Sequence, residues 1–111
     1  MTVPSRPVHE VKSTLFRVLG HPARIRILEL LRDGERSVGS LQAELDLGEG
    51  STSQHLAALR RIGLVDSRRE GTTIYYRVGD GRVFELLAVS RDIIVAQLAS
   101  QQSVLRELKS S

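Results

Sequence analysis

A short polar run, from Ser51 to Gln54, has the chemistry needed to contact the edges of DNA bases. Ser51, Ser53 and Gln54 open a segment with helical spacing, and their side chains can both donate and accept hydrogen bonds. Gln54 is the strongest candidate, because an amide can make a paired contact with adenine in the major groove. An N-cap role is an equally good interpretation of Ser51, since serine is a preferred residue at helix starts.

Arginines follow this run at close intervals. A guanidinium group presents a flat fork of donors that matches a phosphate, so such residues supply salt-dependent affinity without reading sequence. We expect these arginines to contact phosphates or the minor groove, and Thr72 at the hairpin tip to contact DNA beside them. The arginines are Arg60, Arg61, Arg68, Arg69 and Arg77.

Composition limits what else the chain can be. Its 111 residues, 41% of them hydrophobic, fit one domain. Sixteen Lys and Arg against thirteen Asp and Glu give a net charge of only +3, so the positions of the charges matter more than their sum. No apolar run approaches the roughly 20 residues of a membrane span and no signal-peptide pattern is present, which predicts no membrane contact and a cytoplasmic location.

Metal and catalytic chemistry have little support. The absence of cysteine excludes disulfides, thiolate metal sites and thiol redox switches. The histidines are His9, His21 and His55, which form no recognisable ligand motif. His9 and Glu10, with a residue of a partner subunit, are a candidate nickel or zinc site, although no cofactor is required. We expect no enzyme, because Ser53 and His55 would diverge by about 200° on a helix and cannot form a dyad.

Apolar spacing predicts four helices after a mobile N-terminal arm at residues 1–7. In the fourth helix, Thr52, Leu56 and Leu59 are expected to point inward, and Ala58 outward with the polar residues. Gly50 or Ser51 is the expected N-cap of this helix, and Ser37 that of the third. The expected ranges are 8–19, 21–33, 38–46 and 51–62.

Alternation replaces helical spacing beyond Gly63. Residues 64–69 and 72–78 predict a β-hairpin with a basic tip. A long helix follows from about residue 82, and a Gln and Ser cluster at 100–103 predicts a break or fraying in it. So much apolar surface on a terminal helix predicts a partner, and its main stripe is Val83, Leu87, Ile94 and Leu98.

Two short helices joined by a tight turn and followed by a basic hairpin are the components of a winged helix-turn-helix. Three motifs in this order also resemble the ArsR/SmtB family of prokaryotic regulators, over roughly residues 12–98. They are LGHPARIRIL at 19–28, SQHLAALRRIGLV at 53–65 and RREGTTIYYR at 68–77. The resemblance implies a homodimer paired through the first and last helices, with two reading helices in successive major grooves. It also favours a structural or DNA-backbone role for His55.

The sequence departs from this family at its sensor sites. Many relatives bind metals through two cysteines at the start of the third helix, where this chain has Ser37 and Gly39. Others use aspartate and histidine on the last helices, yet residues 81–109 contain no histidine. The effector therefore stays open among an unusual metal site, a small molecule in the dimer crevice, a partner protein and none.

The sequence thus predicts a mainly α protein with a β-hairpin wing, whose residues 8–109 form one DNA-binding and dimerisation domain. We expect it to bind a palindromic operator in double-stranded DNA as a homodimeric transcriptional regulator, either repressor or activator. The alternative is a winged-helix module whose basic wing binds an acidic protein partner.

Overall fold

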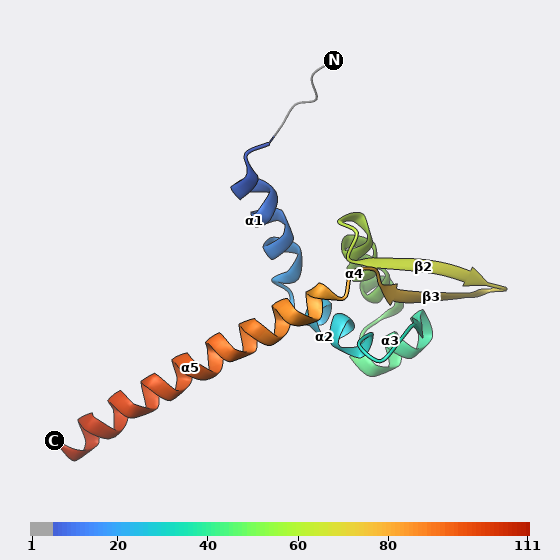
Figure 1. The fold of residues 1–111 in the computed structure, drawn as a ribbon. Coiled ribbons are helices and arrows are strands. Elements are labelled where there is room, and N and C mark those ends of the chain that lie inside the picture. Colours follow the sequence, from blue (N-terminus) through green and yellow to red (C-terminus); the bar gives the residue numbers. More distant parts are fainter. Residues whose placement is uncertain (1–5) are drawn as a thin grey trace. The chain divides into compact units, whose positions relative to one another are not determined.

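The computed structural model describes residues 6–111, apart from the side chain of Glu49. Most of the predicted mobile arm, residues 1–5, lies outside this range. The chain divides into two compact units, of which the first ends at Asp80 and the second is Gly81–Ser111 (Figure 1). The elements are α1 (Val8–Leu19), α2 (Pro22–Leu30), β1 (Arg36–Ser37), α3 (Val38–Leu45), α4 (Glu49–Arg61), β2 (Val65–Glu70), β3 (Thr73–Val78) and α5 (Arg82–Ser110).

Local chemistry explains where two of these helices begin. At the start of α2, the Nδ1 atom of His21 accepts a hydrogen bond from Ala23 N at 3.3 Å, and Pro22 occupies the first turn. At the start of α3, Ser37 Oγ accepts one from Ser40 N at 3.1 Å, which confirms the predicted cap. Helix α2 ends at Leu30, earlier than predicted, and a turn that closes at Gly34 follows it.

The predicted N-cap of α4 is wrong. This helix begins at Glu49, and its N-cap is Gly48, whose backbone is extended at φ −64° and ψ 156°. Ser51 therefore lies inside the first turn rather than at the cap. The connection from α3 is short because Asp46 adopts a left-handed conformation at φ 53°, which ends α3 and turns the chain toward α4.

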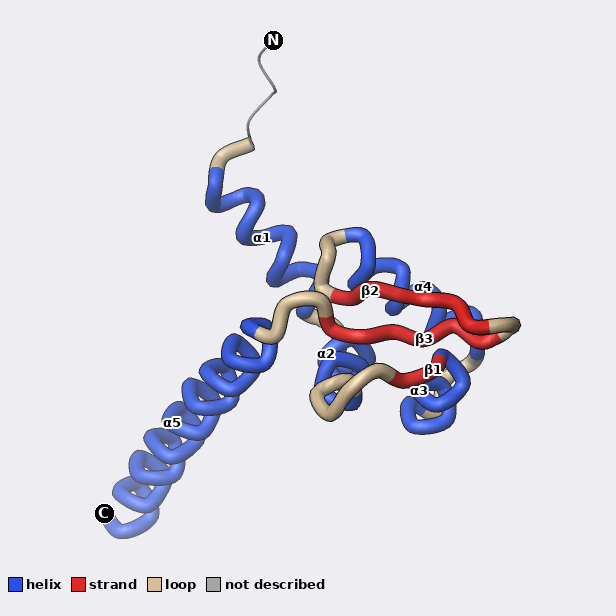
Figure 2. Tube along the Cα trace, turned by 45° about the vertical axis from the view of Figure 1, so that its right-hand side comes forward, coloured by secondary structure: helices blue, strands red, loops and turns tan. Residues whose placement is uncertain are grey.

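The predicted hairpin is part of a three-stranded antiparallel sheet with the order β1-β3-β2 (Figure 2). Val65 pairs with Val78 at its base and Glu70 with Thr73 near its tip, where Gly71 takes φ 63°. Strand β1 was not predicted, because its two residues are too few to show alternation. It pairs Arg36 with Tyr76, and so joins the hairpin to the start of α3.

A small apolar core joins α2, α3, α4 and β2. Ala58 belongs to it with only 8% of its surface exposed, so its predicted outward orientation is wrong. Thr52 is the polar member, fully buried as predicted, and its hydroxyl donates to Gly48 O at 3.3 Å. The fully buried aliphatic residues of α2, α3 and α4 are Ile27, Leu28, Leu41, Leu56 and Leu59.

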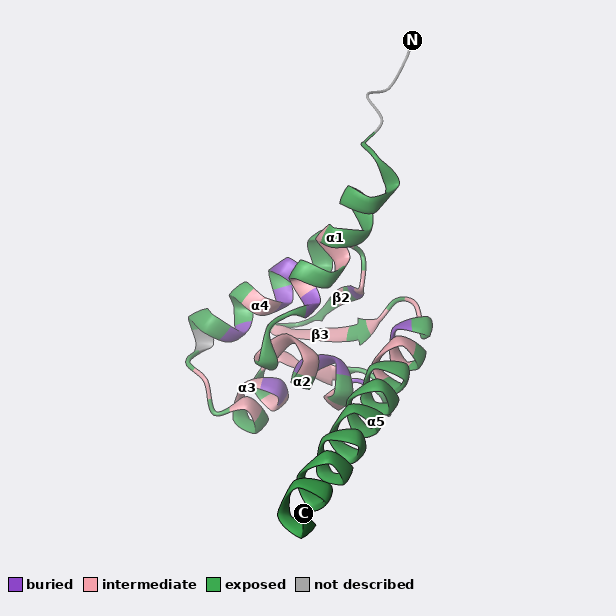
Figure 3. Cartoon of the chain, turned by 90° about the vertical axis from the view of Figure 1, so that its left-hand side faces the viewer, coloured by how far each residue is buried: buried purple, intermediate pink, exposed green. Residues whose placement is uncertain are grey.

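The second unit is one helix. Helix α5 runs from Arg82 to Ser110 without the break predicted at residues 100–103, and Ser103 Oγ donates to Ala99 O within it at 3.2 Å. Figure 3 shows it exposed over most of its length. Within the described residues, no helix is long and apolar enough to cross a membrane.

Candidate nucleic-acid interface

Helix α4 has a buried face and an exposed polar face. Thr52, Leu56 and Leu59 are fully buried, whereas Ser53 and Gln54 are exposed. The buried residues fix the rotation of α4 about its own axis, because turning it would expose them and bury the polar ones. Together with the short turn from α3, this is a helix-turn-helix, and the hairpin β2–β3 is its wing.

Two residues of the predicted site come together between α4 and the wing. Ser53 lines a groove of about 520 Å³ together with Thr72, which lies near the hairpin tip. Gln42 of α3 also lines it, a residue that the sequence analysis did not select. Side chains from α3, α4 and the wing thus share one polar groove.

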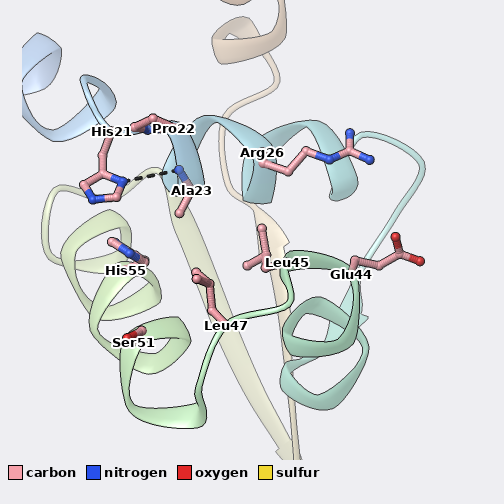
Figure 4. Close-up of a pocket in the computed structure, with 9 residues that line it drawn as sticks. All are labelled: His21, Pro22, Ala23, Arg26, Glu44, Leu45, Leu47, Ser51 and His55. Carbon is pink, nitrogen blue, oxygen red and sulfur yellow. Dashed lines mark hydrogen bonds between the residues drawn. The ribbon is translucent and has the colours of Figure 1, made fainter.

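Ser51 and His55 lie on a different side of α4 from Ser53. Both line a second pocket of about 460 Å³, next to the start of α2 and the end of α3 (Figure 4). Two residues along a helix turn the side chain by about 200°, which explains why Ser51 and Ser53 diverge. Both serines were expected on one outward face of the helix, and the structure separates them.

His55 makes contacts inside the protein. Its Nδ1 atom accepts a hydrogen bond from Arg24 Nε at 3.2 Å, and its ring centroid lies 4.3 Å from that of His21. Burial lowers the pKa of His55, and the neighbouring His21 and Arg24 lower it further. The uncharged ring therefore links α4 to α2.

Arg68 of the wing is bound to carboxylates. Its guanidinium hydrogen-bonds to Glu35, which precedes β1, and to Glu70 at 2.8 Å, and it lies 4.5 Å from the centre of the Tyr75 ring. The hydrogen bonds to Glu35 and Glu70 raise the pKa of Arg68. The hydrogen bond from Arg68 in turn lowers the pKa of Glu35. The charge of Arg68 is thus satisfied within the protein.

The other arginines of the predicted site are more available. Arg60 and Arg61 are exposed in the last turn of α4, and Arg69 is exposed on β2 opposite Ile74. Arg77 faces Asp66 across the hairpin with a separation of 4.0 Å, a weak surface pair. Arg60, Arg61 and Arg69 make no ion pair within residues 6–111.

Comparison with known proteins identifies the family. The family described as "Bacterial regulatory protein, arsR family" matches residues 21–67, from the start of α2 into β2. Rv0081, an uncharacterized HTH-type transcriptional regulator of Mycobacterium tuberculosis, is 42% identical over 106 residues, which are 95% of this chain and 93% of that protein. The chain belongs to the arsR family. Its fold is the winged helix-turn-helix predicted from the sequence.

Solved structures agree with this assignment. The crystal structure of Rv0081 superposes with a TM-score of 0.79 over 87% of this chain and 98% of that one, at 42% identity. A winged helix-turn-helix DNA-binding domain of Mycobacterium bovis, described as homodimeric, has a TM-score of 0.66 and 33% identity over 85% of this chain and 90% of that one. The biofilm growth-associated repressor of Agrobacterium fabrum is 40% identical over 85 residues, 73% of each protein. This chain is accordingly a DNA-binding transcriptional regulator and not an enzyme.

The candidate metal ligands of this arsR-family chain do not form a complete site within one subunit. His9 and Glu10 are exposed in the first turn of α1. Within residues 6–111, no three His, Cys, Asp or Glu side chains lie close enough together to hold a metal ion. A site at His9 would need ligands from another subunit.

Sequence reasoning missed the residues that fix the predicted site in place. Arg24 lies 31 positions from its partner His55, and Glu35 lies 33 positions from Arg68, so no local pattern joins either pair. The roles of Glu70 and Asp66 could have been predicted from the sequence. Each lies two residues from Arg68 on the expected strand and so shares its face, and the hairpin register places Asp66 opposite Arg77.

Proposed function

We propose that this chain is a homodimeric regulator that reads the major groove of a palindromic operator with α4. One observation carries the proposal: α4 is anchored by fully buried residues, while Ser53 and Gln54 remain exposed and Ser53 lines a groove shared with the wing. Small polar side chains on a firmly held helix are suited to hydrogen-bond with base edges.

We assign base contacts to Gln54 and Ser53, with Ser51 as a further candidate. Phosphate contacts fall first to Arg60, Arg61 and Arg69, because these arginines are exposed and have no ion-pair partner in the described part of the chain. Thr72 and Arg77 can add contacts from the wing. Arg68 and His55 are weaker candidates, since each already has hydrogen-bond partners inside the protein.

Dimerisation is supported by exposed apolar side chains on α1 and α5. On α1 these include Val8, Val11 and Phe16, each more than half exposed. Pairing them with a second copy removes apolar surface from water, and a two-fold axis would duplicate α4. The operator should then contain two half-sites about 10 base pairs apart, or a multiple of that spacing.

The test is a gel-shift titration on the DNA upstream of the chain's own gene, with a shuffled duplex for comparison, over a range of salt concentrations. We expect selective retardation with a steep salt dependence. Gln54→Ala should flatten the preference for the operator, whereas Arg69→Ala should weaken both duplexes alike. Arg106→Ala, which removes an exposed arginine of α5, is the matched control and should change neither.

Equal binding to every duplex, or a monomer at micromolar concentration, would contradict the proposal. Binding to an acidic protein but to no DNA would favour the interaction-module alternative instead. Whether the regulator represses or activates depends on where its operator lies relative to the promoter, which genome-wide mapping of bound sites would reveal.

A metal effector is a separate hypothesis that rests on His9 and Glu10. Imidazole and carboxylate groups suit zinc or nickel, and a two-fold partner could supply the remaining ligands. Calorimetric titration of the metal-free dimer with either ion should release heat that His9→Ala abolishes. Heat at background level, or unchanged heat in the variant, would dispose of the site.

A further inference from the structure

One arginine side chain joins three helices. Arg24 of α2 donates from Nε to Nδ1 of His55 on α4 at 3.2 Å, and from Nη1 to the carbonyl of Val18 in the last turn of α1 at 3.2 Å. Both hydrogen bonds are partly buried, so water competes with them less than at an exposed site. We call this arrangement the Arg24–His55 link.

The link requires one protonation state of His55. Because Arg24 Nε carries a hydrogen, Nδ1 of His55 must present its lone pair, and the ring proton must be on Nε2. A proton on Nδ1 would place two donors, and two positive charges, against each other. Nδ1 of His21 is constrained in the same way, since it accepts from Ala23 N.

The surroundings offer no compensation for a charge on His55. His21, the N-cap of α2, lines the pocket together with Arg26 of α2 and Glu44 of α3, whose charged ends extend away from His55 (Figure 4). Arg26 pairs with Glu29 at 3.8 Å, and Glu44 pairs with Arg36 at 3.7 Å. No carboxylate within the described residues makes an ion pair with His55. Burial, and then the neighbouring His21 and Arg24, lower its pKa.

We propose that Arg24, which also binds the end of α1, is a positioning residue for DNA reading: it ties α4 to α2 only while Nδ1 of His55 is unprotonated. Acidification then loosens α4 against α2, although its buried face stays in the core, and weakens operator binding. The inference rests on the proposed function, because it assumes that α4 reads DNA. It gives His55 a role opposite to a phosphate contact, since a phosphate contact would strengthen as the ring gains a positive charge.

The experiment measures operator affinity by fluorescence anisotropy from about pH 8 to about pH 5.5, a range in which histidine is the side chain that ordinarily titrates. The probe is the duplex from upstream of the chain's own gene, at constant ionic strength. For the wild type we expect a loss of about threefold to tenfold on acidification, the equivalent of one or two hydrogen bonds.

Three variants separate the contributions. His55→Asn keeps an acceptor near the place of Nδ1 but cannot be protonated, so it should bind well at high pH and lose the acid-dependent drop. Arg24→Gln should bind about threefold to tenfold more weakly even at high pH. His21→Asn preserves the cap of α2 and is the matched control: it should keep the drop in affinity that His55→Asn removes.

The Arg24–His55 link is overturned if the wild type binds more tightly at low pH and His55→Asn abolishes that gain, or if His55→Asn retains the full drop. Nitrogen-15 NMR of the histidine rings gives a readout without DNA, and Nδ1 of His55 should be the unprotonated nitrogen at neutral pH. If the wild type prefers no duplex at any pH, the proposed function fails, and the NMR result alone decides whether the link exists.

Discussion

Aliphatic side chains are largely buried in one unit of this chain and largely exposed in the other. In the head, by which we mean the described residues up to Asp80, Leu41, Leu56 and Leu59 are fully buried. In α5, residues of the same type, such as Ile94 and Leu98, are 53% and 56% exposed. The head closes its core within one chain, whereas α5 leaves apolar surface exposed, and the proposed dimer would cover it.

This difference separates two kinds of stability. The core of the head should contribute the same free energy at any protein concentration. Any stabilisation that α5 gains from pairing must depend on concentration, because association follows mass action. Substitutions in the two regions can therefore be told apart by dilution, which makes the comparison testable.

The largest effect should come from breaking the pairing of α5. Ile94→Glu combined with Leu98→Glu places two charges on its apolar stripe and should convert the dimer to a monomer. Operator affinity should fall by about 100-fold or more, because two linked heads bind far more tightly than one. Sedimentation and anisotropy measure the two effects, and circular dichroism should show that the head remains folded.

Ala96→Glu is the matched control for this variant. Ala96 is exposed on α5 and lies about 200° around the helix from both Ile94 and Leu98. The Ala96→Glu variant should remain dimeric and keep its affinity for DNA. If the double variant stays dimeric as well, the apolar stripe is not the surface that pairs.

The second effect concerns the core of the head. Leu56→Ala should lower the free energy of unfolding by about 2–5 kcal/mol, because Leu56 is fully buried and the truncation leaves a cavity. Denaturant titrations at several protein concentrations should give the same loss each time. Leu108→Ala removes an exposed leucine of α5, and any loss that it causes should shrink on dilution. A concentration-dependent loss for Leu56→Ala would mean that the head does not close its own core.

A third, smaller effect tests the backbone between α4 and the wing. Gly63 takes φ +80° with no atom within 4 Å of an added Cβ, so Gly63→Ala carries a conformational cost alone. We expect a loss of about 1 kcal/mol in thermal unfolding. Gly39→Ala, in the first turn of α3 and equally unobstructed, should instead be neutral or stabilising by about 0.5 kcal/mol. Equal losses in both variants would contradict the backbone explanation.

Most of the fold follows from local signals in the sequence. Helical spacing located the five helices of residues 6–111, alternation located the hairpin, and the cap at Ser37 is formed as predicted. The errors occur where local signals are weak. Ala58 is too small to favour either face of a helix, and the serines and glutamines at 100–103 are compatible with a continuous α5.

The candidate site was less predictable than the fold. The polar run on α4 could be identified from residue types, but the partners of its neighbours could not. Arg68 illustrates this limit: as a residue in a basic hairpin it resembles a phosphate contact, yet Glu35, distant in sequence, binds it. Tertiary contacts decide which arginines are available, and a single sequence does not encode them in any local pattern.

The smallest effect should come from the exposed ion pair between Arg68 of β2 and Glu35 before β1. Glu35→Gln weakens the hold of β2 on the segment before β1, so amide hydrogen exchange in β2 and β3 should rise about twofold to fivefold at neutral pH, as expected for an exposed ion pair. In the wild type the same loosening should appear on acidification. Because the pKa of Glu35 is lowered in the folded protein, the contribution of Glu35 to stability is complete above the ordinary glutamate pKa of about 4.3. It is lost as the pH falls through the lower pKa of the folded protein.

Glu70→Gln is the matched control, because it removes the other carboxylate on Arg68. Glu70 lies on the same strand as Arg68 and links no second segment to it, so hydrogen exchange in β2 and β3 should barely change. Identical exchange in the two variants would show that the wing is held by its backbone pairing alone.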